Sequence, residues 1–142
     1  MKNRKTLTVV ILICIIAIIA GVLLYKPPGK TADAEVIQAS SGLFSNEEMN
    51  EAVECIKNHF KKEFRDCELL KLKYVSDTEN TSPQYAYLLK EYDIDQYIVY
   101  RMTFKVGKRY NPSYESNSTE EINIVLGRKA NGTWKYLTGG RP

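Results

Sequence analysis

Three side chains that could hold a metal ion recur at helical spacing in the middle of the sequence. Cys55, His59 and Glu63 are spaced four residues apart, so a helix would bring them to one side. Cysteine and histidine are common zinc ligands, but a structural zinc site needs four ligands. The sequence offers no fourth ligand and no HExxH or CxxC motif. We therefore predict no metal site, and we interpret these residues as a helix flank with a half-buried histidine.

The sequence carries no pattern typical of nucleophilic or acid–base catalysis. His59 is the single histidine, and no GxSxG motif is present. Asp93 and Asp95 stand almost side by side in the turn-like stretch YDIDQ, where capping and loop solvation explain them. We predict no catalytic residue and no cofactor.

Aromatic side chains are the strongest candidates for binding a ligand. Of the ten tyrosines, Tyr74, Tyr100 and Tyr136 fall on the predicted inward faces of strands, as does Trp134, the single tryptophan. Aromatic groups with a polar tip can line a ligand pocket. They can also fill a core and form local hydrogen bonds. Both alternatives stay open at this point.

A long amphipathic helix and four strands must position these residues. The stretch FSNEEMNEAVECIKNHFKKEF begins with an S-x-x-E capping box, Ser45 and Glu48, flanked by the staple positions Phe44 and Met49. Alternating patterns over 67–74, 96–106, 120–129 and 133–138 predict strands, with an Asn131-Gly132 hairpin signal between the last two. The fold class expected is α+β: a long N-terminal helix packed on a curved four-stranded antiparallel sheet, preceded by one transmembrane helix.

Two connections between these elements are long. Residues 85–91 favour a short helix, and residues 107–119 show no periodicity and are expected to form an exposed loop. In the strand at 67–74, the alternation places Leu70, Leu72 and Tyr74 on one face.

An apolar run near the N-terminus predicts attachment to a membrane. Residues 7–25 contain no charged side chain, and as a helix they would be roughly 28 Å long, close to the hydrocarbon thickness of a bilayer. Lys2, Arg4 and Lys5 precede the run, which indicates a cytoplasmic N-terminus and an extracellular C-terminal domain. The Ala32-Asp33-Ala34 pattern leaves open cleavage and secretion.

The sequence predicts three parts along the chain. We expect a signal-anchor segment at 1–30, a tether at 31–42 and one extracytoplasmic domain at 43–142. The first 30 residues carry five of the 20 Lys and Arg residues and no acid, so the formal charge of +3 belongs to the anchor. Residues 31–142 are slightly acidic, with 15 basic and 17 acidic side chains, which excludes a basic footprint for nucleic acid.

The cysteines are predicted to be free thiols. Cys55 lies in the middle of the predicted helix and Cys67 beyond its end, an offset of about 13 Å, whereas a disulfide needs Cα atoms within about 7 Å. Cys14 lies inside the apolar run, and the residues before it are not the small ones of a lipoprotein signal.

The order of elements resembles a known family. A long helix, CELLKLKYVS, a short helix, YIVYRMTFKV, a polar loop and GRKANGTWKYLTGG together resemble a small extracytoplasmic domain of unknown function from Gram-positive bacteria, over about residues 43–140. That family is similar to the cystatin-like, nuclear-transport-factor-like α+β cone. The resemblance implies a position behind a signal or lipid anchor, and it implies no reaction. The missing lipoprotein signal departs from the family's lipidated form.

These observations favour a membrane-anchored extracytoplasmic binding or interaction domain without enzymatic activity. Its partner would be a protein or small molecule outside the cell. One alternative is an enzyme that uses the cone pocket with an Asp or Tyr as acid or base. Another is an accessory subunit of a membrane complex.

Overall fold

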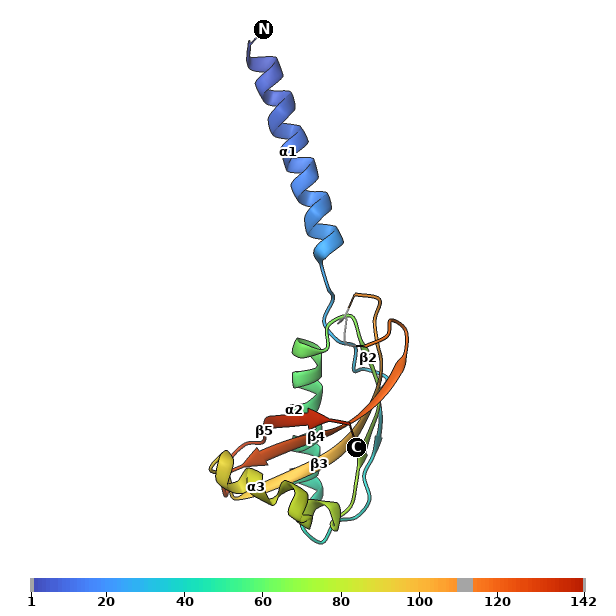
Figure 1. Cartoon of the computed structure of the whole chain (residues 1–142), viewed down its shortest axis with the longest axis vertical. Helices are drawn as coiled ribbons and strands as arrows, with labels where there is room; N and C mark the ends of the chain where they lie inside the picture. The colour runs from blue at the N-terminus through green and yellow to red at the C-terminus, as the bar shows by residue number, and fades with distance from the viewer. Residues whose placement is uncertain (1, 110–113, 142) are drawn as a thin grey trace.

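A computed structural model describes residues 2–109 and 114–141 of the chain, with side chains from residue 6 onward. A long helix leads into an α+β domain (Figure 1). In chain order the elements are α1 (Lys2–Leu24), β1 (Glu35–Ile37), α2 (Asn46–Glu63), β2 (Glu68–Tyr74), the 3-10 helix η1 (Glu79–Thr81), α3 (Pro83–Glu91), β3 (Gln96–Lys105), β4 (Thr119–Arg128) and β5 (Lys135–Gly140). The short helix predicted at 85–91 is confirmed as α3. Of the loop predicted at 107–119, residues 110–113 lie outside the described residues.

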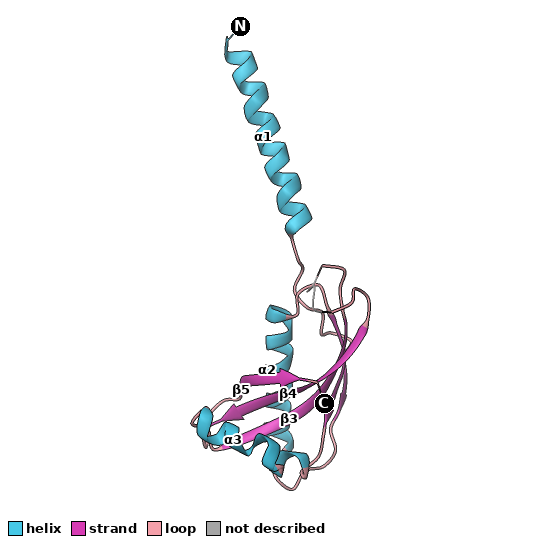
Figure 2. Ribbon diagram, viewed as in Figure 1, coloured by secondary structure: helices cyan, strands magenta, loops and turns pink. Residues whose placement is uncertain are grey.

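The sheet has five strands in the order β1-β2-β3-β4-β5 (Figure 2). The strands β2 to β5 are antiparallel neighbours, whereas β1 pairs in parallel with β2. The prediction of a four-stranded antiparallel sheet is therefore wrong, and the sheet is mixed. The missed strand has only three residues, Glu35–Ile37, too few to show an alternating pattern, and it lies within the segment predicted as a tether.

Helix α2 covers one face of the sheet and begins at the predicted capping box. The Glu48 backbone N–H donates to Ser45 Oγ at 3.2 Å, and the Ser45 N–H donates to Glu48 Oε2 at 2.7 Å. Two orphan amides are thereby satisfied, and the staple residues Phe44 and Met49 are both buried. The buried residues of the helix lie on one stripe: Met49, Ala52, Val53, Ile56 and Phe60.

The strand β2 differs from its expected alternation. Leu70 is 37% exposed, while Leu69, Leu72 and Tyr74 are buried. A register irregularity between Leu69 and Lys71 inserts an extra residue against β3. Such a bulge switches the side chains before it to the other face, so the prediction that Leu70 faces the core is wrong.

The opposite face of the sheet also carries apolar side chains, which the prediction of a single apolar face missed. Buried Leu88 of α3 packs there with Tyr97, Val99 and Val125. Because β3 alternates on both faces, Ile98, Tyr100, Met102 and Phe104 point to α2 while Tyr97 and Val99 lie under α3. The described layers are thus α2, the sheet and α3.

The hairpin predicted at Asn131-Gly132 is confirmed by the pairing of β4 with β5. Its connection is longer than a two-residue turn, because β4 ends at Arg128 and β5 begins at Lys135. Asn131 takes a left-handed conformation with φ of 59°, and the Gly132 N–H donates to the Lys129 carbonyl at 2.9 Å.

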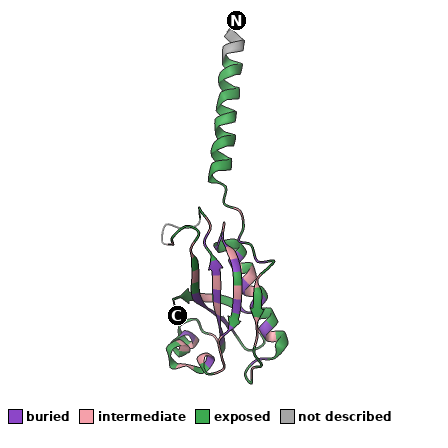
Figure 3. Cartoon of the chain, turned by 90° about the vertical axis from the view of Figure 1, so that its right-hand side faces the viewer, coloured by how far each residue is buried: buried purple, intermediate pink, exposed green. Residues whose placement is uncertain are grey.

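Helix α1 lies outside the folded domain and is exposed along its described side chains (Figure 3). Its segment Thr6–Leu24 is 19 residues long with a mean hydropathy of 3.3, long and apolar enough to be a membrane span or a signal sequence.

The chain joins the domain almost immediately after this helix. The Asp66 N–H donates to the Pro27 carbonyl at 2.7 Å, and the Gly29 N–H donates to the Lys61 carbonyl at 3.2 Å. Lys30 then bonds Cys67 and Leu69 through its backbone. Residues 27–30, which we call the exit segment, are therefore part of the fold.

A substitution at Gly29 tests this docking. A Cβ at Gly29 would lie 2.7 Å from the Phe60 carbonyl oxygen and 2.7 Å from its ring, so Gly29→Ala forces the exit segment away from α2. We expect a loss of about 1–3 kcal/mol in the free energy of unfolding, as for other overpacked sites. We also expect faster tryptic cleavage after Lys30.

Urea melts and limited trypsin digestion of the full chain in detergent would measure both effects. Gly140→Ala is the matched control, because nothing lies within 4 Å of a Cβ there. Equal behaviour of the two variants would show that the exit segment is not docked.

Candidate functional site

An open groove runs between α2 and β5. It has a volume of about 670 Å³. Its lining residues are Glu51, Glu54, Cys55, Asn58, His59 and Lys62 from α2, and Thr133, Trp134, Lys135 and Tyr136 from the β5 side. Aromatic rings and a thiol lie among charged side chains of both signs.

Two stacked rings, one from α2 and one from β5, connect the two sides of the groove. The imidazole of His59 lies over the ring of Tyr136 with centroids 3.8 Å apart and planes 12° apart. Phe64 meets the imidazole edge-on at 6.2 Å. The Cys55 thiol donates to the Trp134 carbonyl at 3.3 Å. These contacts join the middle of α2 to the start of β5.

Burial favours the neutral forms of two groups in the groove, the Cys55 thiol and the His59 imidazole. Burial raises the pKa of the Cys55 thiol and lowers the pKa of the His59 imidazole. A reactive cysteine needs a lowered pKa and a cationic neighbour, which is the opposite of this arrangement. Within residues 2–109 and 114–141, no group of three or more His, Cys, Asp or Glu side chains is placed to hold a metal ion.

Three of the four predicted ligand-binding residues come together inside the domain. The rings of Tyr74 and Tyr100 meet edge-on at 5.7 Å. Phe44 lies between this pair and Trp134, with centroids 6.4 Å from Tyr74 and 5.8 Å from Trp134. Tyr136 stands apart in the groove, 37% exposed. A role in ligand binding stays a prediction for all four residues.

Tyr74 and Tyr100 direct their hydroxyl groups to local acceptors. Tyr100 donates to the Met49 carbonyl at 3.4 Å, and Tyr74 donates to Asp77 Oδ1 at 2.7 Å. Asp77 also accepts from Ser41 Oγ at 2.6 Å. Burial raises the pKa of Tyr74 to about 12 and raises that of Tyr100 further from its usual range. Both phenols therefore stay protonated at neutral pH.

Sequence reasoning missed a buried arginine beside Trp134. Arg128 is 8% exposed, lies 4.2 Å from the centre of the Trp134 ring and forms an ion pair with Glu48. It also donates to Gln96 Oε1 at 2.9 Å. Hydrogen bonds, first from the Ser45 backbone and then from Arg128, lower the pKa of the Glu48 carboxyl. A signal was present, because Arg128 continues the inward series Ile122, Ile124, Leu126.

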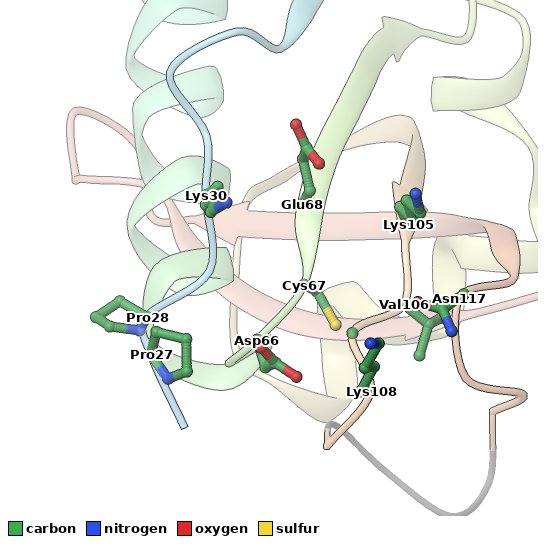
Figure 4. Close-up of a pocket in the computed structure, with 11 residues that line it drawn as sticks. Pro27, Pro28, Lys30, Asp66, Cys67, Glu68, Lys105, Val106, Lys108 and Asn117 are labelled. Carbon is green, nitrogen blue, oxygen red and sulfur yellow. The ribbon is translucent and has the colours of Figure 1, made fainter. Parts of the chain in front are cut away.

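A second hollow of about 280 Å³ lies where the exit segment meets the sheet. Figure 4 shows Lys30 of the exit segment, and Lys105 and Lys108 at the end of β3 and just after it, around Cys67 and Asp66. Asp66 has φ of 65° and accepts from the Arg109 backbone N–H at 2.9 Å. This hollow is at the end of the domain from which α1 departs.

No family model, curated protein or solved structure matches the chain. The expected family resemblance therefore gains no support from these comparisons. What is shown is a small α+β protein with a mixed five-stranded sheet.

The free thiols predicted for Cys55 and Cys67 are confirmed, and Cys14 is also unpaired. Cys55 faces the groove, and Cys67 is buried at the start of β2.

The pKa of His59, the single histidine, reports how far its imidazole is buried in the groove. Because burial disfavours the cation, we expect His59 to titrate below the ordinary value of about 6.5. The folded-state pKa is the lower one, so stability is full above the unfolded pKa and falls as the pH drops through the folded pKa.

An NMR titration of the imidazole in the micelle-bound full chain would give this pKa, and His59→Gln should flatten the pH dependence of the unfolding midpoint. A pKa at or above 6.5 would contradict the half-buried stack.

Proposed function

We propose that the chain is a single-pass membrane protein that displays a non-enzymatic binding domain outside the cell, and that the α2–β5 groove receives a protein partner. The observation that carries the proposal is the groove itself, in which a tyrosine–histidine stack lies next to the last strand of the sheet. The apolar helix Thr6–Leu24 supplies the attachment. The basic residues at the N-terminus favour a cytoplasmic end there.

The docked exit segment supports a retained anchor. Cleavage at the Ala32-Asp33-Ala34 pattern would require this stretch to be accessible and extended. Ala32 and Asp33 are exposed but form a turn, Thr31 is buried, Ala34 packs against the core, and β1 begins at Glu35. A protein cleaved there would lose the backbone bonds that residues 27–30 make with α2 and β2.

The free edge of β5 supports a protein as the partner. In the sheet order β5 is the outer strand, so one side of its backbone pairs with β4 and the other borders the groove. An exposed edge can accept an extended segment of another chain, while side pockets give specificity. Tyr136 would then supply the aromatic contact that binding sites favour.

The hydrogen bonding of the core supports a binding role over catalysis. Tyr74 and Tyr100 are protonated and bonded inside the domain, and Asp77 is engaged by Ser41 and Tyr74. The enzyme alternative with an Asp or Tyr acid or base would need a side chain of this kind to meet a substrate, and these three are engaged inside the domain. The accessory-subunit alternative is favoured by a different observation, the docking of the domain directly beside its membrane helix.

Photo-crosslinking in the native cells tests the groove. A benzophenone amino acid at Lys135 or Glu54 should give the same adduct, because both positions line the groove. The control position is Glu121, which is exposed and lies on the sheet face away from α2. Tyr136→Ala should weaken the adduct, and Tyr136→Phe should preserve it because the ring stack remains.

An equally strong adduct from Glu121 would contradict the proposal. So would an adduct from Lys135 or Glu54 whose yield does not fall in the Tyr136→Ala variant. Crosslinking to a small set of membrane proteins from both groove positions would support it.

A further inference from the structure

We propose that the membrane-proximal end of the domain binds anionic phospholipid headgroups through Arg65, Lys108 and Arg109. This inference rests on the retained anchor proposed above, and it assigns a second surface that is separate from the α2–β5 groove.

The length of α1 places Tyr25 and Lys26, which precede the exit segment, in the headgroup layer. The apolar part, Thr6–Leu24, has 19 residues, and at 1.5 Å per residue it is about 28 Å long, close to a hydrocarbon core of about 30 Å. Leu24 therefore lies at the hydrocarbon boundary. The polar layer extends roughly 5–8 Å further on each side, which accommodates Tyr25 and Lys26.

Two arginines are held against this part of the backbone. Arg65 Nε donates to the Lys26 carbonyl at 2.8 Å, and an Arg109 guanidinium N–H donates to the Tyr25 carbonyl at 3.2 Å. Arg65 follows α2 and Arg109 follows β3, so two different parts of the domain meet the chain here. Whatever the tilt of α1, these bonds keep both guanidinium groups within two residues of Leu24.

The chemistry of these groups suits a lipid phosphate. A guanidinium carries five N–H donors in a planar fork, so one bond to a carbonyl leaves donors for phosphate oxygens. Both arginines and Lys108 are exposed. Lys108 extends the surface into the hollow that it lines with Lys30 and Lys105 (Figure 4). Asp66 and Glu68 also line this hollow, and Asp66 accepts from the Arg109 backbone.

The charged residues of α2 differ between the end of the helix near α1 and the end away from it. The first turn of α2 carries the acidic residues Glu47 and Glu48, and its last turn carries Lys61 and Lys62 beside the final residue Glu63. Its C-terminal end is the one nearer to α1 (Figure 1). The basic end therefore faces the bilayer and the acidic end points away, which is the orientation that a negatively charged surface stabilises.

The full chain in lipid nanodiscs provides the test. Its thermal unfolding is compared in phosphatidylcholine and in a mixture of phosphatidylcholine with phosphatidylglycerol. We expect the anionic lipid to raise the midpoint by roughly 4–8 °C, and high salt to remove the difference by screening. The Arg65→Gln/Arg109→Gln variant should lose most of this difference, with Lys108→Gln losing part of it.

The matched control is Lys90→Gln/Lys129→Gln, which removes the same charge from exposed positions elsewhere in the domain and should retain the lipid difference. Native mass spectrometry should show retained phosphatidylglycerol on the wild-type chain and less on the arginine variant. The proposal is overturned by equal midpoints in the two lipids, by a difference that survives in the arginine variant, or by an equal shift from inorganic phosphate in phosphatidylcholine.

The nanodisc measurement starts from the intact chain with its mass verified, so cleavage of the anchor in cells does not enter it. A negative result here therefore counts against headgroup binding alone, and the groove proposal keeps its own crosslinking test.

Discussion

Replacing Trp134 by alanine is expected to lower the free energy of unfolding by about 3–5 kcal/mol, the usual cost of truncating a large core aromatic. The side chain is 6% exposed, and its indole N–H donates to the Glu48 carbonyl at 3.0 Å. It also packs edge-on against Phe44 and beneath Arg128. All of these contacts are lost together, and a cavity is left at the start of α2.

Urea denaturation of the full chain in detergent, followed by circular dichroism, would measure this loss. Tyr136→Ala is the matched control, because this more exposed aromatic residue of β5 should cost only about 1 kcal/mol. A small loss for Trp134→Ala, accompanied by a ligand that copurifies with the wild type, would favour a ligand-lined pocket over a filled core.

Removing the carboxylate of Glu48 is expected to cost a similar amount. Glu48→Ala leaves Arg128 buried without its anionic partner and removes the acceptor for the Ser45 N–H. Breaking a buried ion pair from one side typically costs about 3–5 kcal/mol. Since Glu48 itself is one-third exposed, we expect a value near the lower end.

Two variants separate charge from hydrogen bonding at this site. Glu48→Gln removes the charge but keeps one of the two acceptor oxygens, so it should lose less than Glu48→Ala, about 1–2 kcal/mol. In the double variant Glu48→Ala/Arg128→Met the buried cation is gone, so part of the loss should be recovered. Strictly additive losses in the double variant would show that the pair is not coupled.

Helix α2 was predictable because its signals are local and agree with one another. The capping box, the staple and the apolar stripe all fall within one continuous stretch, and each is satisfied inside the helix or against a single face of the sheet. The strands β3 and β4 were equally predictable from the sequence, since each has ten residues. Their length lets a period of two stand out.

The elements that escaped prediction depend on partners distant in the chain. The strand β1 is defined by its pairing with Lys71–Lys73, and three residues carry too little pattern of their own. The bulge at Leu70 arises from the register with β3, which the alternation in β2 does not encode. The hydrophobic cluster around Leu88 exists because α3 folds back over the sheet.

The candidate site was foreseen in part. The aromatic residues were identified, but only Trp134 and Tyr136 line the groove, while Tyr74 and Tyr100 are enclosed. The stacking of His59 on Tyr136 joins residues far apart in the sequence, and it depends on how β5 lies against α2. The docking of Arg65 and Arg109 on the Lys26 and Tyr25 carbonyls likewise follows from tertiary structure alone.

We propose that the domain stays joined to the apolar helix α1 in the membrane. The measurement that tests it most directly is the intact mass and N-terminal sequence of the protein isolated from native membranes. The docked exit segment predicts a chain that begins before α1 and sediments with the membrane fraction. A mature chain that begins at Glu35 and is released into the medium would contradict the account.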